Sequence, residues 1–250
     1  MQQRTTPSRR AGFTLAEMLI AVVIIMILMG IGAYAILRMR DTGPAQATIA
    51  NLGKLKAVLD SQWKAVVDKA RRDPLPSGVT RDQLINQRIK QAFPISFVEI
   101  YDPTKMPSIG VWQPYKQYLD GLGLGLNSTT AAQYPADVQQ GICLQMILER
   151  GPSHADLSVD QLGTSLIQQI QTNPTNISGL TNKQVQAIVD GWSKPLLFSR
   201  NYKNAASTLG IVSMGANGKA GVQVDVSSSS NHNLVITSQV DADDNITIPD

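Results

Sequence analysis

The chain has 250 residues, of which 43% are hydrophobic and 16% charged, and this composition indicates one or two folded domains and excludes a wholly disordered protein. A single cysteine, Cys143, excludes an internal disulfide framework and metal sites of the CxxC type. The net charge of +3 arises in the first 12 residues, which hold Arg4, Arg9 and Arg10 and no acid, so the remaining basic and acidic residues balance. We therefore expect no nucleic-acid partner.

The N-terminal region contains a long apolar run. Residues 18–37 carry no charge, and extending the run back to Phe13 adds only one acid, Glu17. Twenty-five helical residues span about 37 Å, which exceeds the ~30 Å hydrocarbon core of a bilayer. The run ends in Arg38-Met39-Arg40, which does not resemble the cleavage site of a secretory signal. A buried core helix is the alternative, but such helices rarely lack a polar face over twenty residues.

These features predict a membrane helix that is retained in the mature protein. Three arginines precede the span, while two arginines and Asp41 follow it. Because positive charge favours the cytoplasmic side, the N-terminus is expected in the cytoplasm and the body of the chain outside.

The residues that precede the span form a specific pattern. From Arg9 to Ile20 the sequence reads RRAGFTLAEMLI. This segment resembles the leader and N-terminus of type IV pilin-like proteins, which include type IV pilins and the pseudopilins of type II secretion. The resemblance implies that a prepilin peptidase cleaves between Gly12 and Phe13, that Phe13 is then N-methylated, and that Glu17 is the fifth residue of the mature chain. Ala16 stands where many members have Val.

The chemistry of Glu17 follows from its position in an apolar helix. A carboxylate in lipid costs several kcal/mol unless it is neutral or paired, so Glu17 needs a partner. The amine of Phe13 is a candidate, either in the same chain at the helix N-terminus or in a neighbouring chain. Pairing between chains would fix the axial step of a helical filament. The alternative is a side chain that reaches the membrane edge by snorkelling.

After the span, residues 45–70 predict an amphipathic helix. Its apolar positions recur every three or four residues: Ile49, Leu52, Leu55, Leu59, Trp63 and Val66. Residues 71–74, Arg-Arg-Asp-Pro, predict its end, and Gly43-Pro44 is a candidate break before it. The family resemblance implies that the apolar stripe packs on a C-terminal sheet. A basic membrane-surface helix is the rival interpretation, which the interspersed acids disfavour.

Residues 75–185 predict a mostly helical insertion, longer than the corresponding part of the small major pseudopilins. We expect helices at 80–93, with Thr80 as the cap, at 135–149, at 159–172 and from Thr181 to near Asp190. The segment from Phe93 to Tyr118 is rich in aromatic residues and prolines. It is read as a packed irregular segment, with a surface for a partner or glycan as the alternative.

The last third of the chain predicts short strands in a small antiparallel sheet, at 195–199, 208–214, 222–227 and 234–240. Two local patterns are again similar to pseudopilins. Residues 190–196 are similar to an Asp-x-Trp-Gly-x-Pro segment, with Ser193 in place of Gly. Residues 213–219 are similar to a Ser-x-Gly-x-Asp-Gly turn, with Asn217 in place of Asp.

Major pseudopilins bind calcium near this turn, and the candidate ligands here are Asp241, Asp243 and Asp244, with Asn217 or Asn245 as neutral donors. Hard oxygen ligands suit Ca²⁺. The aspartates nevertheless lie some twenty residues beyond the turn, farther than in the family, and a solvated acidic tail is the default interpretation of such a cluster. Thermal melts with calcium and with a chelator distinguish the two.

No catalytic constellation is evident. His154 and His232 are the only histidines and have no metal-ligand neighbours at helical spacing, and Cys143 lies among apolar residues as an inert buried thiol would. We therefore expect a structural protein and not an enzyme, with no required cofactor.

The predicted fold is α+β, a long N-terminal helix packed on a small C-terminal antiparallel sheet. Its parts are a cleaved leader (1–12), the transmembrane half of the helix (13–37), its amphipathic half (38–74), the helical insertion (75–185) and the sheet region with an acidic tail (186–250). The expected location is the inner membrane, with a single pass and a periplasmic C-terminal domain, followed by a filament after assembly.

The favoured function is a pseudopilin of a type II secretion system. Its expected partners are prepilin peptidase, other copies or pilin-like subunits, the inner-membrane assembly platform and membrane lipid. A type IV pilus subunit, for instance a minor pilin used in adhesion or DNA uptake, is the close alternative. A periplasmic enzyme or binding protein that merely uses the leader as an anchor is an alternative of another class.

Overall fold

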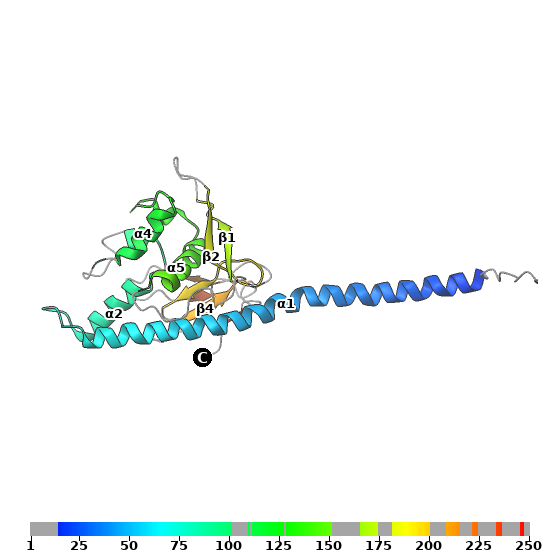
Figure 1. Ribbon diagram of the computed structural model, residues 1–250, viewed down its shortest axis with the longest axis horizontal. Coiled ribbons are helices and arrows are strands. Elements are labelled where there is room, and N and C mark those ends of the chain that lie inside the picture. Colours follow the sequence, from blue (N-terminus) through cyan, green and yellow to red (C-terminus); the bar gives the residue numbers. More distant parts are fainter. Residues whose placement is uncertain are drawn as a thin grey trace, which may run out of the picture. The chain divides into compact units, whose positions relative to one another are not determined.

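The computed structural model describes residues 15–101, 110, 112–127, 129–151, 166–174, 182–200, 209–215, 222–224, 234–236 and 246–247 (Figure 1). The chain divides into two compact units, residues 1–43 and 44–250, which are described in turn. The combination of helices with small antiparallel sheets confirms the predicted α+β class.

Helix α1 (Leu15–Arg72) has 58 residues and runs through both units. It continues through Gly30 and Gly32, and also through Pro44, so the break expected at Gly43-Pro44 is not found. Proline removes one intrahelical hydrogen bond, but the turns on either side of it retain theirs. The helix ends at Arg72, immediately before Asp73-Pro74, as predicted.

The part of α1 in the second unit buries one apolar stripe. Leu52, Leu55, Leu59 and Val66 are at most 7% exposed, and Trp63 packs at the edge of the core. The stripe joins a core that includes residues of the strands, as the family resemblance implied. Ile49 is the exception, because its side chain is 55% exposed. The polar Thr48 takes the buried position at this end of the stripe.

Helix α2 (Arg81–Ala92) begins at Thr80 with a reciprocal cap. The Thr80 Oγ1 accepts from the Gln83 backbone N–H at 3.3 Å, and the Gln83 Oε1 accepts from the Thr80 backbone N–H at 2.9 Å. Leu84, Ile89 and Ala92 are buried, so both the boundaries and the inward face were predicted correctly. Two short helices follow, α3 (Val98–Tyr101) and α4 (Gln113–Gly121), and then a 3₁₀ turn, η1 (Ala131–Gln133).

The aromatic segment between α2 and α4 is packed, which confirms the first of its two interpretations for the described residues. Phe93, Phe97 and Tyr115 are at most 1% exposed. The Tyr115 hydroxyl donates to the Ala92 carbonyl at 2.6 Å, and the Trp112 indole donates to the Arg150 carbonyl at 2.9 Å. Each polar end of these rings therefore has a partner inside the fold.

Helix α5 (Ala136–Arg150) is the centre of the second unit. Every residue from Val138 to Leu148 is buried, and the helix contacts β2, β3 and α4. Two of its buried glutamines bind backbone groups of other segments. The Gln139 Oε1 accepts from the Phe97 N–H at 2.8 Å, and the Gln140 Oε1 accepts from the Phe198 N–H at 3.0 Å. These side chains supply acceptors to backbone donors that would otherwise be unpaired.

Strands β1 (Ile167–Gln171) and β2 (Gln184–Ile188) form an antiparallel hairpin in which Ile167 is opposite Ile188. The helices expected at 159–172 and from Thr181 are therefore wrong over these residues. Leu166, Ile167 and Ile170 fit a helical spacing, but β2 alternates between exposed and buried positions over its first four residues. Its inward residues contact α5, and this tertiary packing decides the outcome.

The four strands expected in the last third are all present, but they do not form one sheet among the described residues. Strand β3 (Leu197–Ser199) pairs with β4 (Gly210–Ser213), and β4 pairs with β7 (Ile246–Thr247). Strands β5 (Val222–Val224) and β6 (Leu234–Ile236) form a separate antiparallel pair.

Candidate functional site

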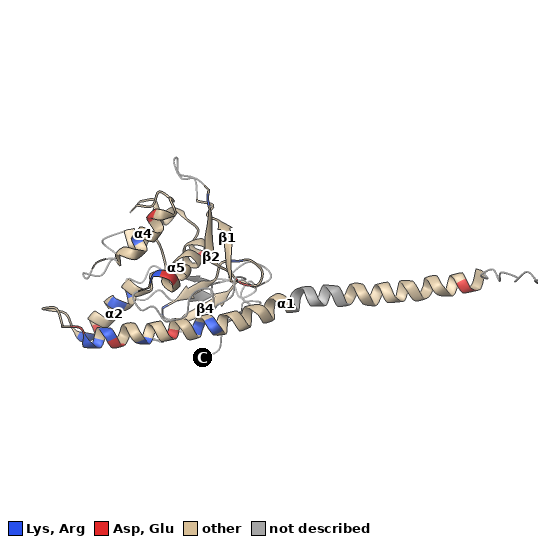
Figure 2. Cartoon of the chain, viewed as in Figure 1, with Lys and Arg blue, Asp and Glu red and all other residues tan. Residues whose placement is uncertain are grey.

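The first unit consists of an apolar helical segment. Residues Leu15–Tyr34 are long and apolar enough to cross a membrane, and none of this stretch is buried within the structure. Figure 2 shows a single charged residue, an acidic one, on this stretch of α1 in the first unit, whereas the part of α1 in the second unit carries many. Every residue from Leu15 to Tyr34 is exposed, so none of them belongs to the core of the described residues.

Glu17 lies in the first turn of α1 with an exposed side chain. A carboxylate in this position interacts favourably with the positive end of the helix dipole. Gly12 and Phe13 lie outside the described residues. Cleavage between them, methylation of Phe13 and its pairing with Glu17 therefore stay predictions.

In the second unit, the loop of residues 190–194, here named the Asp190 loop, folds around one carboxylate. Asp190 is 2% exposed. Its Oδ1 accepts from the backbone N–H groups of Trp192 and Lys194, both at 2.9 Å. Its Oδ2 accepts from the Ser213 hydroxyl at 2.7 Å. Both carboxylate oxygens are thus engaged inside the protein.

The two segments that resemble pseudopilin patterns meet at this point. Ser213 donates to Asp190 and also accepts from the Gly215 backbone N–H at 3.1 Å. Ser193 has a φ of 63°, a left-handed conformation that glycine adopts without strain, which explains why the pattern has Gly there. The hydrogen bond between the buried side chains of Ser213 and Asp190 thus connects two segments that lie 23 residues apart in the sequence.

The Asp190 loop is attached to α1. The Gly191 backbone N–H donates to the Thr48 Oγ1 at 2.8 Å, and the Thr48 hydroxyl donates to the Pro44 carbonyl at 2.7 Å. A Cβ at Gly191 would overlap the Pro44 carbonyl oxygen, so the close approach requires glycine. The contact therefore holds the loop against the beginning of the second unit.

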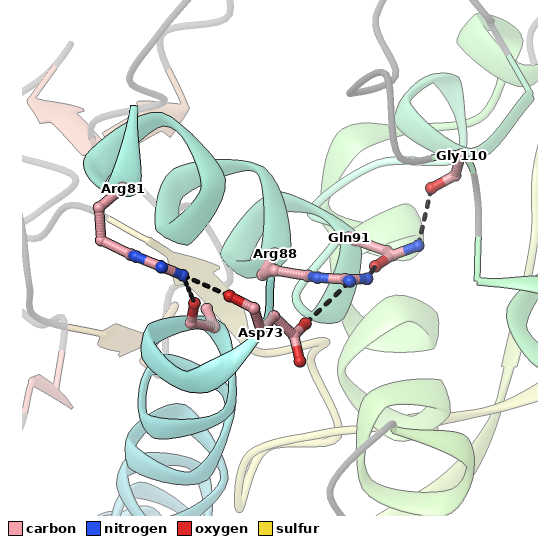
Figure 3. Close-up of polar contacts among 6 residues, drawn as sticks. Asp73, Arg81, Arg88, Gln91 and Gly110 are labelled. Carbon is pink, nitrogen blue, oxygen red and sulfur yellow. Dashed lines mark hydrogen bonds and ion pairs between the residues drawn. The ribbon is translucent and has the colours of Figure 1, made fainter. Parts of the chain in front are cut away.

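The other end of α1 is fixed by α2 (Figure 3). The Arg81 Nη1 donates to the carbonyls of Ala70 at 2.9 Å and Asp73 at 2.6 Å, which satisfies acceptors at the helix C-terminus. Arg88 forms an ion pair with Asp73 at 2.9 Å. The positive charge of Arg81 also interacts favourably with the negative, C-terminal end of the α1 dipole. These contacts between α1 and α2 therefore stabilise the fold.

A buried ion pair links α3 to the residue after β3. The guanidinium of Arg200, 4% exposed, binds both oxygens of Glu99 and also donates to the Phe93 carbonyl at 3.2 Å. Burial raises the pKa of the nearby Cys143 thiol well above its usual range, and the Glu99 charge adds to this effect. Cys143 is fully buried, as predicted, and its thiol is protonated at neutral pH.

Within the described part of the chain, no group of three or more His, Cys, Asp or Glu residues could hold a metal ion. The calcium candidates Asp241, Asp243 and Asp244, like Asn217 and Asn245, lie outside that part, as do His154 and His232. Asp190, beside the Ser213–Gly215 turn, already uses both oxygens in hydrogen bonds. Calcium binding by the tail stays a prediction.

Sequence reasoning missed the attachment of the Asp190 loop to α1 and the Glu99–Arg200 pair. The only sequence signal for the first was Thr48, a polar residue in register with the apolar stripe of the helix. No local pattern indicates that Glu99 and Arg200, 101 residues apart, lie together.

Residues 7–33 match a family model described as the prokaryotic N-terminal methylation motif. The match contains Gly12, Phe13, Glu17 and nearly all of the candidate span. No curated protein and no solved structure matches the chain. The N-terminus therefore carries a leader of the type IV pilin-like kind, followed by a helix that fits a membrane anchor.

Proposed function

We propose that this protein is a pilin-like structural subunit of a type II secretion pseudopilus. Prepilin peptidase cleaves it between Gly12 and Phe13, and the first half of α1 holds it in the inner membrane. From there the assembly platform transfers it into a periplasmic filament. The observation that carries this proposal is the methylation motif at residues 7–33, combined with an apolar helical stretch, Leu15–Tyr34, in which no residue is buried.

The exposed apolar helix supports both a membrane stage and a filament stage. Each Å² of apolar surface removed from water contributes about 25 cal/mol, and either lipid or neighbouring copies of the helix can cover this surface. When the helix moves from lipid into contact with neighbouring helices, it exchanges one apolar environment for another, so a polar interaction is needed to fix the axial register between subunits. Glu17 supplies that interaction by accepting a hydrogen bond from the Phe13 amine of an adjacent subunit.

The choice of a pseudopilus over a pilus is supported by the second unit. Asp190 and Ser213 belong to the two segments that resemble pseudopilins, and they form one hydrogen-bonded site. Ser193 takes the left-handed conformation that suits the Gly of that pattern. These features support the assignment through local structure, and the genetic experiment below tests it.

The assembly role is tested with Glu17→Ala and Glu17→Lys, with Ala16→Val as the matched control. Both Glu17 variants are expected to be processed and inserted normally but to be absent from sheared filaments, because the partner of the Phe13 amine is lost. Ala16→Val is expected to assemble like the wild type. Normal assembly of either Glu17 variant would remove Glu17 from the mechanism.

The wider function is tested by deleting the gene. Loss of secretion of folded proteins supports the pseudopilus. Loss of surface pili, adhesion or DNA uptake would instead indicate a type IV pilus subunit. Loss of one soluble activity, with secretion and pili intact, would indicate an anchored enzyme or binding protein.

A further inference from the structure

Strand β1 forms one edge of the β1–β2 hairpin. Helix α5 contacts β2, and within the described residues β2 is the strand that pairs with β1 (Figure 1). The Val189 N–H donates to the Leu166 carbonyl at 2.8 Å, and the Thr172 N–H donates to the Lys183 carbonyl at 3.0 Å. Because hydrogen-bonded pairs alternate along an antiparallel ladder, the even-numbered residues of this segment bond to β2. The backbone groups of the odd-numbered residues point away from β2, along an edge with no partner strand among the described residues: Ile167, Gln169 and Gln171.

This edge carries none of the charges that commonly keep open strands apart. Residues 161–182, which include all of β1, contain no Asp, Glu, Lys or Arg. Natural sheets often protect an open edge with charged residues, above all lysine, because these oppose pairing with a second strand. Gln169 and Gln171 are exposed on β1, and their neutral amides present no such obstacle. The sequence therefore leaves the edge of β1 able to pair with another strand.

A row of amide side chains leads to this edge. The Gln145 Nε2 of α5 donates to the Gln186 Oε1 at 3.2 Å, and Gln186 lies opposite Gln169 on the exposed face of the hairpin. The Gln169 side chain makes no hydrogen bond with the described residues. An amide both donates and accepts hydrogen bonds, so a glutamine can pair with an identical glutamine, whereas two identical charges would repel. The last amide of the row is thus complementary to a copy of itself.

We propose that β1 pairs with β1 of a second copy of this chain, antiparallel about a two-fold axis at Gln169. In this register Gln169 faces the partner's Gln169, and Ile167 faces the partner's Gln171. Each facing pair exchanges two backbone hydrogen bonds, so the pairing satisfies the whole edge. A two-fold contact closes on itself and therefore produces a dimer and not a filament. Two five-residue strands make a small interface, of the weak and reversible class below about 1,200 Å².

Charge substitution at the axis tests this pairing with the full-length chain in detergent micelles. Gln169→Lys alone, or Gln169→Glu alone, is expected to raise the Kd of the dimer by about tenfold or more in analytical ultracentrifugation, because like charges then face each other. A mixture of the two variants is expected to restore dimers, since opposite charges then meet at the axis. Gln184→Lys, which changes an exposed glutamine of β2, is the matched control and is expected to dimerise like the wild type.

Crosslinking tests the same axis in cells. Cys143 is fully buried, so the introduced thiol of Gln169→Cys is the accessible one for a short bismaleimide. Two chains of this variant are expected to crosslink, because residues that face each other in such a ladder lie about 5.5 Å apart at Cα. Gln184→Cys is the control and is expected to remain uncrosslinked, because β2 lies one strand farther from the axis.

A wild type that stays monomeric at high concentration, or a Kd that Gln169→Lys leaves unchanged, would overturn the inference. So would a mixture of the Lys and Glu variants that stays monomeric although both keep the circular dichroism of the wild type. Crosslinking of Gln169→Cys to a different protein, with none between copies, would overturn it by placing another partner on the edge. These measurements do not involve filaments, so their outcome is distinct from that of the function proposed above.

Discussion

Replacing Asp190 by alanine tests whether the Asp190 loop depends on its central carboxylate. The variant removes the acceptor of two backbone N–H groups and one hydroxyl, at 2.7 to 2.9 Å. Hydrogen bonds to a charged group contribute about 1.5–3 kcal/mol each, but they are not additive when they share one side chain. Because water reaches part of the loop, we expect a loss of about 3–4 kcal/mol in the free energy of unfolding.

Asp190→Asn provides the graded comparison, and Asp60→Ala is the matched control. Asparagine keeps one oxygen for the backbone donors, and its amide donates to the Ser213 hydroxyl, so the expected loss is about 1 kcal/mol. Asp60 is exposed and makes a surface ion pair with Lys56 at 3.2 Å, and such pairs contribute about 0–1 kcal/mol.

The assays are urea unfolding and thermal unfolding of the full-length chain in detergent micelles, both followed by tryptophan fluorescence and circular dichroism. At about 2–4 °C for each kcal/mol, Asp190→Ala is expected to lower Tm by roughly 6–16 °C. A loss no larger than that of Asp60→Ala, or equal losses for alanine and asparagine at Asp190, would refute the idea that this carboxylate organises the loop.

Two further predictions follow from the buried groups near α3. Arg200→Met removes the cation beside the buried Glu99 carboxylate and is expected to cost about 3–5 kcal/mol in urea unfolding. Glu99→Gln combined with Arg200→Met is expected to recover part of that loss, and equal losses in the single and double variants would contradict this. Cys143 is expected to resist iodoacetamide at pH 8 until urea unfolds the chain. Burial raises the pKa of its thiol above the ordinary 9.0. As the pH rises above 9, Cys143 ionises in the unfolded chain but stays neutral in the folded chain, so the free energy of unfolding falls. Urea unfolding at a series of pH values measures this fall.

The helices with strong local signals were predictable from the sequence. The capping box at Thr80, the Arg-Arg-Asp-Pro end of α1 and the apolar stripe from Leu52 to Val66 each depend on residues close together in the chain. Such signals determine boundaries without reference to the rest of the fold. The methylation motif belongs to the same class, because its pattern is continuous.

The errors arose where distant contacts decide the structure. Ile167 and Ile170 fit a helix or a strand by spacing alone, and packing of the β1–β2 hairpin on α5 selects the strand. Ile49 fits the apolar stripe, but the Asp190 loop meets the helix at Thr48. The hydrogen bond that attaches this loop to α1 joins Gly191 to Thr48, which lie 143 positions apart, and no local pattern can indicate such a contact.

The position of β7 determines when the three-stranded sheet of β3, β4 and β7 is complete. Strand β4 lies between β3 and β7, and β7 follows β5 and β6 in the sequence. A polypeptide that stops before residue 246 leaves one edge of β4 without its hydrogen-bonding partner, and open edges of this kind promote aggregation. The small sheet is therefore complete only once residues 246–247 have paired with β4.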